Sequence, residues 1–387
     1  MITGAPDELN LSYPETIPTI KSIWDQVLPW FASSEVSIGA DEYDSSLADD
    51  YISFVNEMAE YISNKSGKSI RIWGTNEPSQ TLSISQNVTI QHWDFPDDSI
   101  PVKLMSQGYR VINSEQRYLY LDGKTSDGGE FPYELNASLI WSGAPGNKGW
   151  APNIFSPTDA SNNTSPNEPL LRGSIMAMWN DWGNNATTPL EIYYQLAKSL
   201  AMFSEKVWAG SEIRDTRLTQ EEFEAIYPVL NAAAPGQNLN RAVSVQNGTV
   251  FHYDSVRSGI ETSFDSVGPP YTLKFDINPT SDDGTIFSGI DSILFLQSLT
   301  FQDPATNEYY PLGVTLPKDS YSTVEIHATT LYTYALINET SKYWWTTNLD
   351  IWGEYMKEAN MSFAAPSKAI GGFVGELRNV SLVVGGA

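Results

Sequence analysis

The feature that most constrains the fold is a change of hydrophobic period close to residues 232–240. Upstream of this stretch, segments with three- and four-residue apolar spacing alternate with short strands rich in β-branched residues. Downstream, apolar residues recur at every second position between Asp, Gly, Asn and Pro turns. A chain of 387 residues is also longer than one ordinary domain. The sequence therefore predicts an α/β domain over residues 1–235 and an all-β sandwich over residues 241–387.

Five strands are predicted in the first part of the chain, at residues 35–42, 69–75, 87–94, 109–114 and 173–181. Strands that alternate with helices form right-handed βαβ units and a parallel sheet. A closed (β/α)₈ barrel needs eight strands and typically about 250 residues. The pattern thus predicts part of a TIM-type barrel, about its strands 4 to 8, with about three units absent on the N-terminal side.

The predicted helices have recognisable termini. Apolar residues spaced by three and four positions over residues 47–62 indicate an amphipathic helix. Thr188 and Glu191 form a capping-box pattern in front of a long helix. Thr219 and Glu222 repeat the pattern in front of another.

Charge and composition exclude several classes of function. Lys and Arg number 22 against 47 Asp and Glu, which gives a net charge of −25. Such a chain repels nucleic-acid phosphates and anionic lipid, and it has no run of about 18 apolar residues, so neither nucleic acid nor a membrane is an expected partner. The absence of cysteine excludes disulfides, thiolate zinc sites and a Cys nucleophile. Three histidines are too few for a His-rich metal site and leave a Ser-His-Asp triad few candidates, so no cofactor is expected.

Two counts indicate an extracellular protein that handles carbohydrate. The chain has 12 Trp and 20 Tyr, whose flat apolar face and polar edge suit sugar rings, although most such residues fill cores. Eleven Asn-x-Ser/Thr sequons indicate a secreted eukaryotic glycoprotein. The first residues lack a basic start and an apolar segment. Either a signal peptide has been removed or the chain is the later part of a longer protein.

Acids and aromatic residues gather where the predicted strands end. The carboxyl ends of the strands form the active-site face of βα barrels. An isolated Asp-Glu pair usually solvates a loop, but here the same strand-end position recurs along the sheet. The candidates are Asp41 and Glu42, Trp73, Trp93, Tyr120 and Asp122, and Trp179 and Asp181.

This set of side chains suits cleavage of a glycosidic bond. Such cleavage needs a carboxylic acid that protonates the leaving oxygen and a group that stabilises an oxocarbenium-like centre. Neighbouring residues on a regular strand point to opposite faces. Asp41 and Glu42 stand where the strand turns into a loop, so both can reach one cleft.

Several motifs carry a family resemblance. SIGADEY is similar to the strand H-I-G-G-D-E-V of glycoside hydrolase family 20, the β-N-acetylhexosaminidases and their lacto-N-biosidase relatives. RIWG, IQHW, YRVINS, YLYLD, GWAPNIFSP and MAMWND follow in the family's order, so the resemblance covers about residues 1–210. The tail segment IGGFVGELRNVSL resembles the closing strands of laminin-G or concanavalin-like jelly-roll sandwiches.

The resemblance implies substrate-assisted retaining hydrolysis of glycans that contain β-linked N-acetylhexosamine, in which the substrate's 2-acetamido oxygen attacks the anomeric carbon. By motif position, Glu42 is the general acid/base, Asp41 holds the acetamido N–H and Tyr120 donates to the acetamido oxygen. The other positions would bind the sugar: Trp73, Trp93 and Trp179 as pocket walls, Asp181 on hydroxyls, Trp150 stacked on the next sugar and Asp122 beside Tyr120.

The sequence departs from the family at two places. Trp179-Asn180-Asp181 replaces a Trp-x-Glu motif, as in the lacto-N-biosidase-like branch. The released unit therefore stays open between a single N-acetylhexosamine and a lacto-N-biose-type disaccharide. The family's sugar-gripping arginine on its first strand has no counterpart here.

Three interpretations remain open from the sequence. The first is a hydrolase of the family-20 type, the second a non-catalytic glycan-binding protein or fragment, and the third a hydrolase that uses Asp41 and Glu42 as ordinary acid and nucleophile. His92 is interpreted as a packing or hydrogen-bonding residue. Trp344 and Trp345 fit a sugar-stacking patch as well as a core. Acid-rich stretches could bind calcium but have no defined ligand spacing, and nothing in the sequence indicates the oligomeric state.

Overall fold

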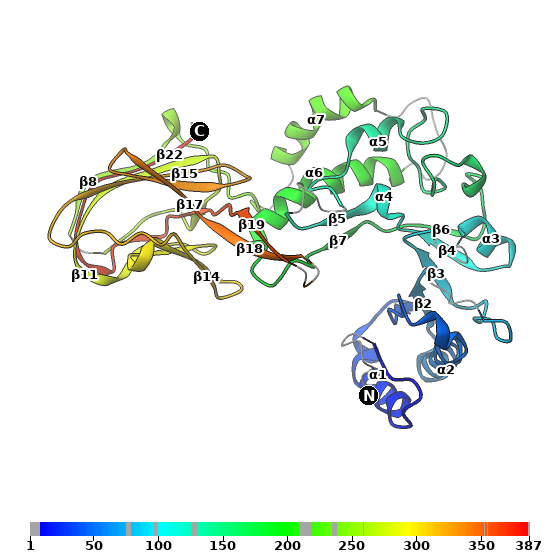
Figure 1. The fold of residues 1–387 in the computed structure, drawn as a ribbon. Coiled ribbons are helices and arrows are strands. Elements are labelled where there is room, and N and C mark those ends of the chain that lie inside the picture. Colours follow the sequence, from blue (N-terminus) through cyan, green and yellow to red (C-terminus); the bar gives the residue numbers. More distant parts are fainter. Residues whose placement is uncertain are drawn as a thin grey trace. The chain divides into compact units, whose positions relative to one another are not determined.

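The computed structural model describes residues 8–74, 79–95, 100–124, 131–208, 218–233, 238–257, 259–351, 353 and 355–385. The chain forms two compact units (Figure 1). Unit 1 consists of Met1–Tyr120, Leu135–Ala177 and Leu200–Ile226, and unit 2 of Leu121–Glu134, Met178–Ser199 and Tyr227–Ala387. Two of the boundaries between the units fall within the helices α6 (Pro189–Trp208) and α7 (Gln220–Ala233). The predicted division at residues 235 and 241 stays a prediction.

The centre of unit 1 is a parallel sheet of five strands that pair in chain order. Helices lie along the strands, as the alternation of helical and strand periods predicts (Figure 1). The strands are β1 (Glu35–Ser37), β2 (Ser69–Trp73), β3 (Thr89–His92), β4 (Arg110–Asn113) and β6 (Leu171–Ser174).

Helix α2 covers this sheet because its apolar residues fall on one side. Residues such as Val55, Met58 and Ile62 are fully buried and pack with Ile70 and Ile90 of the strands. Full burial of one such side chain contributes about 1.5–3 kcal/mol. The helices and turns of unit 1 are α1 (Thr16–Val27), η1 (Leu28–Trp30), η2 (Ser45–Leu47), α2 (Ala48–Ser66), α3 (Pro101–Ser106), α4 (Gln116–Leu119), α5 (Ala137–Ser142) and η3 (Ala160–Asn162).

Both capping boxes form as predicted. The Thr188 N–H donates to Glu191 Oε2 at 2.8 Å, and the Glu191 N–H donates to Thr188 Oγ1 at 3.3 Å. The pair Thr219 and Glu222 makes the same two hydrogen bonds at 2.8 and 3.2 Å. These contacts satisfy the first N–H groups of α6 (Pro189–Trp208) and α7 (Gln220–Ala233).

The prediction of one strand over residues 173–181 is wrong. The segment forms β6 and then β7 (Ala177–Trp179), which pairs with β5 (Tyr120–Asp122) in a separate sheet. The register of β6 against β4 shifts between Leu171 and Ser174, at Gly173, whose φ of +118° is accessible to glycine. Pairing resumes beyond this bulge at Asn113 and Ser174, where β6 ends.

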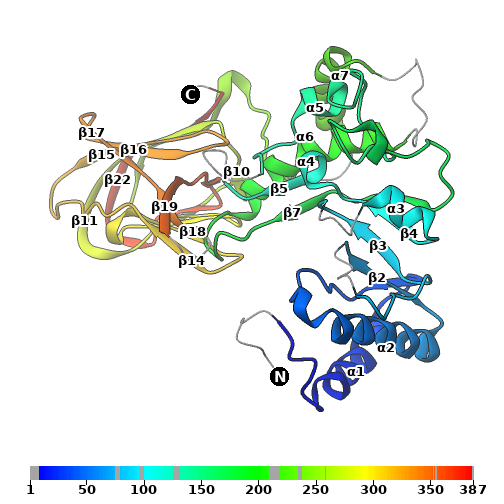
Figure 2. The ribbon, with the colours of Figure 1, turned by 45° about the vertical axis from the view of Figure 1, so that its right-hand side comes forward.

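Unit 2 is dominated by an antiparallel sheet of eleven strands that curls around its own core (Figure 2). The long strand β11 (Tyr271–Ser288) pairs with β15 and β22 near its start and with β12 and β21 near its end. Alternate residues of β11, including Leu273, Phe275 and Ile277, are buried in that core. The β-rich C-terminal part is therefore confirmed, whereas its jelly-roll topology stays a prediction.

The remaining elements of unit 2 are short strands and 3₁₀ turns. They are η4 (Gln246–Gly248), β8 (Thr249–Val256), β9 (Ile260–Glu261), β10 (Ser266–Val267), β12 (Ile293–Phe295), η5 (Gln297–Leu299), β13 (Thr300–Asp303), β14 (Glu308–Pro311), β15 (Ser322–Ala328), β16 (Thr333–Ile337), β17 (Ser341–Trp344), β18 (Thr346–Ile351), β19 (Tyr355–Asn360), β20 (Ala365–Pro366), β21 (Ala369–Ile370) and β22 (Phe373–Val384).

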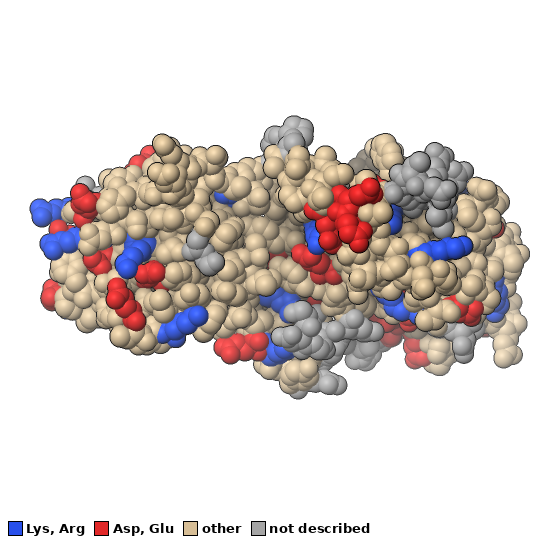
Figure 3. All heavy atoms as spheres, turned by 90° about the horizontal axis from the view of Figure 1, so that it is seen from above, with Lys and Arg blue, Asp and Glu red and all other residues tan. Residues whose placement is uncertain are grey.

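On the side drawn in Figure 3, the described surface has no basic face of the kind that binds nucleic acid. Among the described residues of that side, Lys and Arg lie dispersed between Asp and Glu, and one group of acids stands together. No helix within the described ranges has the length and hydropathy needed to cross a bilayer.

Candidate active site

The turn after β1 presents the predicted acid pair. The backbone beyond β1 still pairs with β2, since the Trp73 N–H donates to the Gly39 carbonyl at 3.0 Å. The chain then turns sharply, with positive φ at Gly39, Ala40 and Glu42. The hydroxyl of Tyr51, a buried residue of α2, donates to the Ala40 carbonyl at 2.8 Å and so anchors this turn. Asp41 and Glu42 are both exposed at its tip.

Three of the predicted aromatic residues of unit 1 lie together. The ring of Tyr120 stacks on Trp93 with 6.3 Å between centroids and 10° between planes. Trp73 meets the same ring edge-on at 6.5 Å. Tyr120 is buried, whereas the two indoles are half-buried. The cluster stands at the carboxyl ends of β2 and β3, the edge of the parallel sheet at which the acid pair also follows β1.

The segment before Tyr120 is held by a buried side-chain hydrogen bond whose partner, Glu115, sequence analysis missed. His92 Nε2 lies 2.9 Å from Glu115 Oε2, and both side chains are fully buried. The Gln116 N–H donates to the Trp93 carbonyl at 2.8 Å, which ties the start of α4 to the end of β3. His92 therefore is the packing and hydrogen-bonding residue that the sequence indicated. Glu115 directly follows a strand end, the one signal that could have found it.

In unit 2 the structure brings Asp122 and Asp181 together. Asp122 is buried, and its Oδ1 accepts the Asp181 N–H at 3.2 Å. The Trp182 indole donates to the Asp122 carbonyl at 3.2 Å. Burial raises the pKa of Asp122 to about 6, and the nearby Asp181 carboxylate adds to the rise. Asp181 is exposed and Trp179 half-buried.

The raised pKa of Asp122 makes the stability of the chain depend on pH. Asp122 binds its proton more tightly in the folded chain than at the ordinary pKa of about 3.9. Its favourable contribution is therefore complete below about pH 4 and is lost as the pH rises through about 6. Between pH 4 and 7 the free energy of unfolding of the parent should therefore fall by about 2 kcal/mol because of Asp122. We expect this part of the fall to be absent in Asp122→Asn, which keeps the acceptor oxygen but does not titrate.

Urea unfolding of the parent and of Asp122→Asn at several pH values between 4 and 7 measures this difference. Asp283→Asn, at an exposed position, is the control and should follow the parent curve. Parallel curves for the parent and Asp122→Asn would contradict the assignment of the decline to Asp122.

Trp150 requires a correction. Its indole is fully buried, lies 6.1 Å from the rings of both Tyr118 and Phe203, and donates from Nε1 to the Ile154 carbonyl at 3.0 Å. Stacking on a sugar needs an exposed ring face, and this ring has none. Trp150 is a core residue of unit 1.

The described residues contain no group of three or more His, Cys, Asp or Glu side chains that could hold a metal ion. Asp282 instead pairs with Lys318 at 2.5 Å. The side chains of the candidate site are carboxylates, a phenol and indole rings.

Comparisons with known proteins match the part of the chain that carries the aromatic cluster of this site. Residues 45–211 match the family model of the glycosyl hydrolase family 20 catalytic domain, a match that begins just after Glu42. A lacto-N-biosidase of Bifidobacterium bifidum is 22% identical over 229 residues. That alignment covers 53% of this chain and 19% of the relative, so the chain spans about a fifth of the relative's length.

Solved structures of similar proteins include a β-N-acetylhexosaminidase from Bacteroides fragilis, with 18% identity, a TM-score of 0.40, and coverage of 58% of this chain and 45% of that one. An exo-β-N-acetylglucosaminidase from Vibrio harveyi, in complex with N-acetylglucosamine, has 17% identity, a TM-score of 0.41, and coverage of 58% and 36%.

Proposed function

We propose that this chain, whose residues 45–211 match the model of the glycosyl hydrolase family 20 catalytic domain, acts in a secreted hydrolase that removes β-linked N-acetylhexosamine, or a lacto-N-biose-type unit, from glycans. One observation carries the proposal. An exposed Asp-Glu pair and an aromatic cluster follow the same ends of neighbouring parallel strands in unit 1. Acids beside aromatic walls are what cleavage of a sugar acetal needs.

The mechanism that we propose is substrate-assisted. The acetamido oxygen of the substrate attacks the anomeric carbon, so the protein supplies no carboxylate nucleophile. Glu42 protonates the leaving oxygen and then deprotonates the attacking water. Asp41 accepts the acetamido N–H, and Tyr120 donates to the acetamido oxygen. The hydrogen bond from the Tyr51 hydroxyl to the Ala40 carbonyl holds the backbone of the acid pair in place before substrate arrives.

The remaining predicted residues have supporting roles in this proposal. Trp73 and Trp93 wall the acetamido pocket around Tyr120. Trp179, Asp122 and Asp181, which belong to unit 2, bind sugar hydroxyls and ring faces. The parallel sheet corresponds to about strands 4 to 8 of a TIM-type barrel, which has eight strands when closed. The eleven sequons support secretion as a glycoprotein.

A second candidate is a glycan-binding protein without catalysis. The described parallel sheet has five strands and is open at β1 and β6, whereas a closed barrel has eight. An open sheet surrounds a bound sugar less completely. Binding of an N-acetylglucosamine-thiazoline without turnover would favour this candidate over the hydrolase.

The deciding experiment compares chromogenic substrates on the full chain. We expect release of p-nitrophenol from the β-N-acetylglucosaminide or from the β-lacto-N-bioside, and none from the β-glucoside, because a 2-hydroxyl cannot replace the acetamido nucleophile. Equal cleavage of glucoside and N-acetylglucosaminide would contradict the assisted mechanism and favour an ordinary carboxylate nucleophile. If the chain neither turns over any of these substrates nor binds the thiazoline, both candidates are contradicted.

A further inference from the structure

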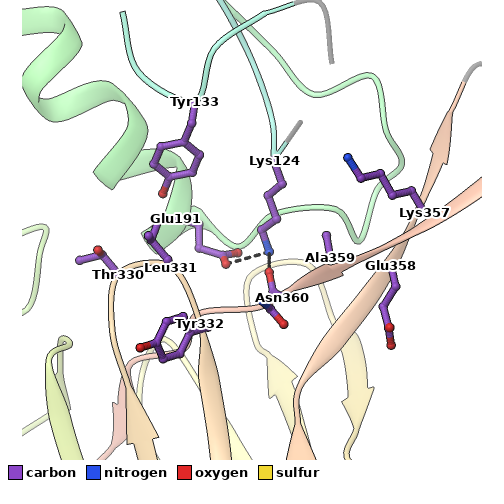
Figure 4. Close-up of a pocket in the computed structure, with 10 residues that line it drawn as sticks. All are labelled: Lys124, Tyr133, Glu191, Thr330, Leu331, Tyr332, Lys357, Glu358, Ala359 and Asn360. Atoms are coloured by element: carbon purple, nitrogen blue, oxygen red, sulfur yellow. Dashed lines mark hydrogen bonds and ion pairs between the residues drawn. The ribbon is translucent and has the colours of Figure 1, made fainter. Parts of the chain in front are cut away.

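Unit 2 contains a cavity of about 290 Å³ that has no part in the proposed hydrolysis (Figure 4). Its walls come from segments far apart in the sequence: the residues around Lys124 and Tyr133, the start of α6, the turn between β15 and β16, and strand β19. All of these segments belong to unit 2.

The floor of the cavity is a fixed ion pair. Lys124 Nζ lies 2.7 Å from Glu191 Oε1, and the side chains are only 8% and 2% exposed. Lys124 also donates to the Asn360 carbonyl at 2.9 Å. Glu191 is held in turn by the N–H of Ser362 at 2.6 Å, beyond its capping-box contacts. The two charges cancel, so the floor offers polar groups in fixed positions without favouring a charged ligand.

A phenol group in the wall lacks a partner. The Tyr133 hydroxyl is buried and makes no hydrogen bond within the described part of the chain. It points into the cavity toward Glu191 (Figure 4). Burial raises the pKa of Tyr133, so its phenol stays protonated and remains a donor. A buried donor without a partner is destabilising, and a ligand hydroxyl in the cavity would accept its hydrogen bond.

The cavity continues into an exposed aromatic surface, formed by Tyr332, Tyr334 and Trp344. Tyr332 lines the cavity and meets Trp344 edge-on at 5.2 Å. Tyr334 lies 5.0 Å from Trp344, directly across the strand pair β16–β17. Trp344 is 40% exposed, although burying it would be favourable. Trp345, the next residue, faces the core and packs on Phe301 at 4.8 Å, so the two tryptophans have different roles.

The polar groups around these rings include donors for the hydroxyls of a ligand. Lys342 Nζ lies over the ring faces, 3.7 Å from the Tyr334 centroid and 4.2 Å from that of Trp344. Lys357 is a second lysine that lines the cavity (Figure 4). Flat rings with hydrogen-bond donors beside them suit the alternating C–H and O–H groups of a pyranose.

We propose that the cavity and the aromatic surface form a second carbohydrate site, in which one uncharged sugar unit enters the cavity and the next unit stacks on Tyr332 and Trp344. The proposal rests on the proposed function only in its choice of glycan. Such a site would hold a glycan chain on unit 2 independently of the residues assigned to hydrolysis, and would raise the local concentration of substrate.

Binding of oligosaccharides is measured by calorimetry on the full chain. All variants carry the background substitution Trp73→Ala, which removes a wall of the candidate active site and so weakens binding there. The probes are triacetylchitotriose and cellotriose. We expect at least one probe to bind, and Trp344→Ala to raise its Kd about tenfold. Tyr343→Ala is the matched control, since Tyr343 is 38% exposed on the same strand but lies opposite Ala335, a residue of the core face. Its Kd should stay within about twofold of the background.

Tyr133→Phe removes only the hydroxyl and should weaken binding about fivefold or more, without lowering the melting temperature, because no hydrogen bond of the described chain is lost. The proposal is overturned if neither probe binds, or if Trp344→Ala and Tyr343→Ala have equal effects. It is also overturned if binding disappears with Trp73→Ala alone. If the parent chain hydrolyses none of the chromogenic substrates but the Trp73→Ala chain still binds a probe, the proposed function is contradicted and this site stands.

Discussion

Glu42→Gln is expected to lower kcat/KM for glycans with poor leaving groups by roughly 10²–10⁴-fold. Glutamine keeps the shape of the side chain but cannot give a proton to the leaving oxygen. An aryl glycoside with an acidic phenol needs little protonation, so its kcat/KM, which ends at the departure of the leaving group, should fall much less. The measurement is kcat/KM for a p-nitrophenyl glycoside and for the corresponding alkyl glycoside, in the parent and in the variant.

Glu60→Gln provides the matched control for this prediction. Glu60 is an exposed residue of α2, so the substitution makes the same change of charge away from the strand ends. Its kcat/KM should equal that of the parent for both substrates. If Glu42→Gln slows both substrates to the same extent, Glu42 is not the acid, and unchanged turnover of the alkyl glycoside would give it no role in catalysis.

Asp41→Asn and Tyr120→Phe are expected to weaken the binding of a thiazoline that mimics the oxazolinium about tenfold more than the binding of N-acetylhexosamine product. Hydrogen bonds to charged groups contribute about 1.5–3 kcal/mol, and only the mimic develops the charge and the geometry that these residues orient. Tyr120→Phe keeps the stacking of the ring on Trp93. Its effect therefore isolates the hydroxyl.

The measurement is a pair of inhibition constants for each variant and the parent. Tyr118→Phe serves as control because Tyr118 is a buried tyrosine of the same segment whose hydroxyl donates to the Gly143 carbonyl at 3.0 Å. It should change both constants equally. An equal loss for mimic and product in Asp41→Asn or Tyr120→Phe would mean uniform binding, and the assisted mechanism would lose its support.

Local physical chemistry made much of this protein predictable from sequence. Helix α2 and both capping boxes follow from spacings of three and four residues, which place interacting side chains on adjacent turns whatever the rest of the chain does. The β-rich C-terminal part is equally predictable, because apolar residues at every second position place their side chains on one face of a strand. The strand ends, and so the positions of Trp73 and Trp93, follow from where each apolar run stops.

Contacts between distant residues were beyond these patterns. Trp150 lies in the motif GWAPNIFSP and is predicted from it to stack on a sugar. In the structure, its ring instead packs beside Phe203, 53 positions further along the chain. The strand over residues 173–181 divides because β4 and β5 offer two different partners to one segment. The pair His92 and Glu115 joins residues 23 positions apart, and no local period connects them.

By itself, then, the sequence determined the two classes of structure, the helix termini and the edge of the sheet at which acids and aromatics follow the strands, because these depend on neighbours within a few residues. The tertiary structure alone decided which aromatic rings are exposed and which polar groups lack partners. Burial depends on which distant residues the fold brings close. Trp344 meets Tyr334 across the strand pair β16–β17 and stays exposed, while Trp345, one position later, packs on Phe301 in the core.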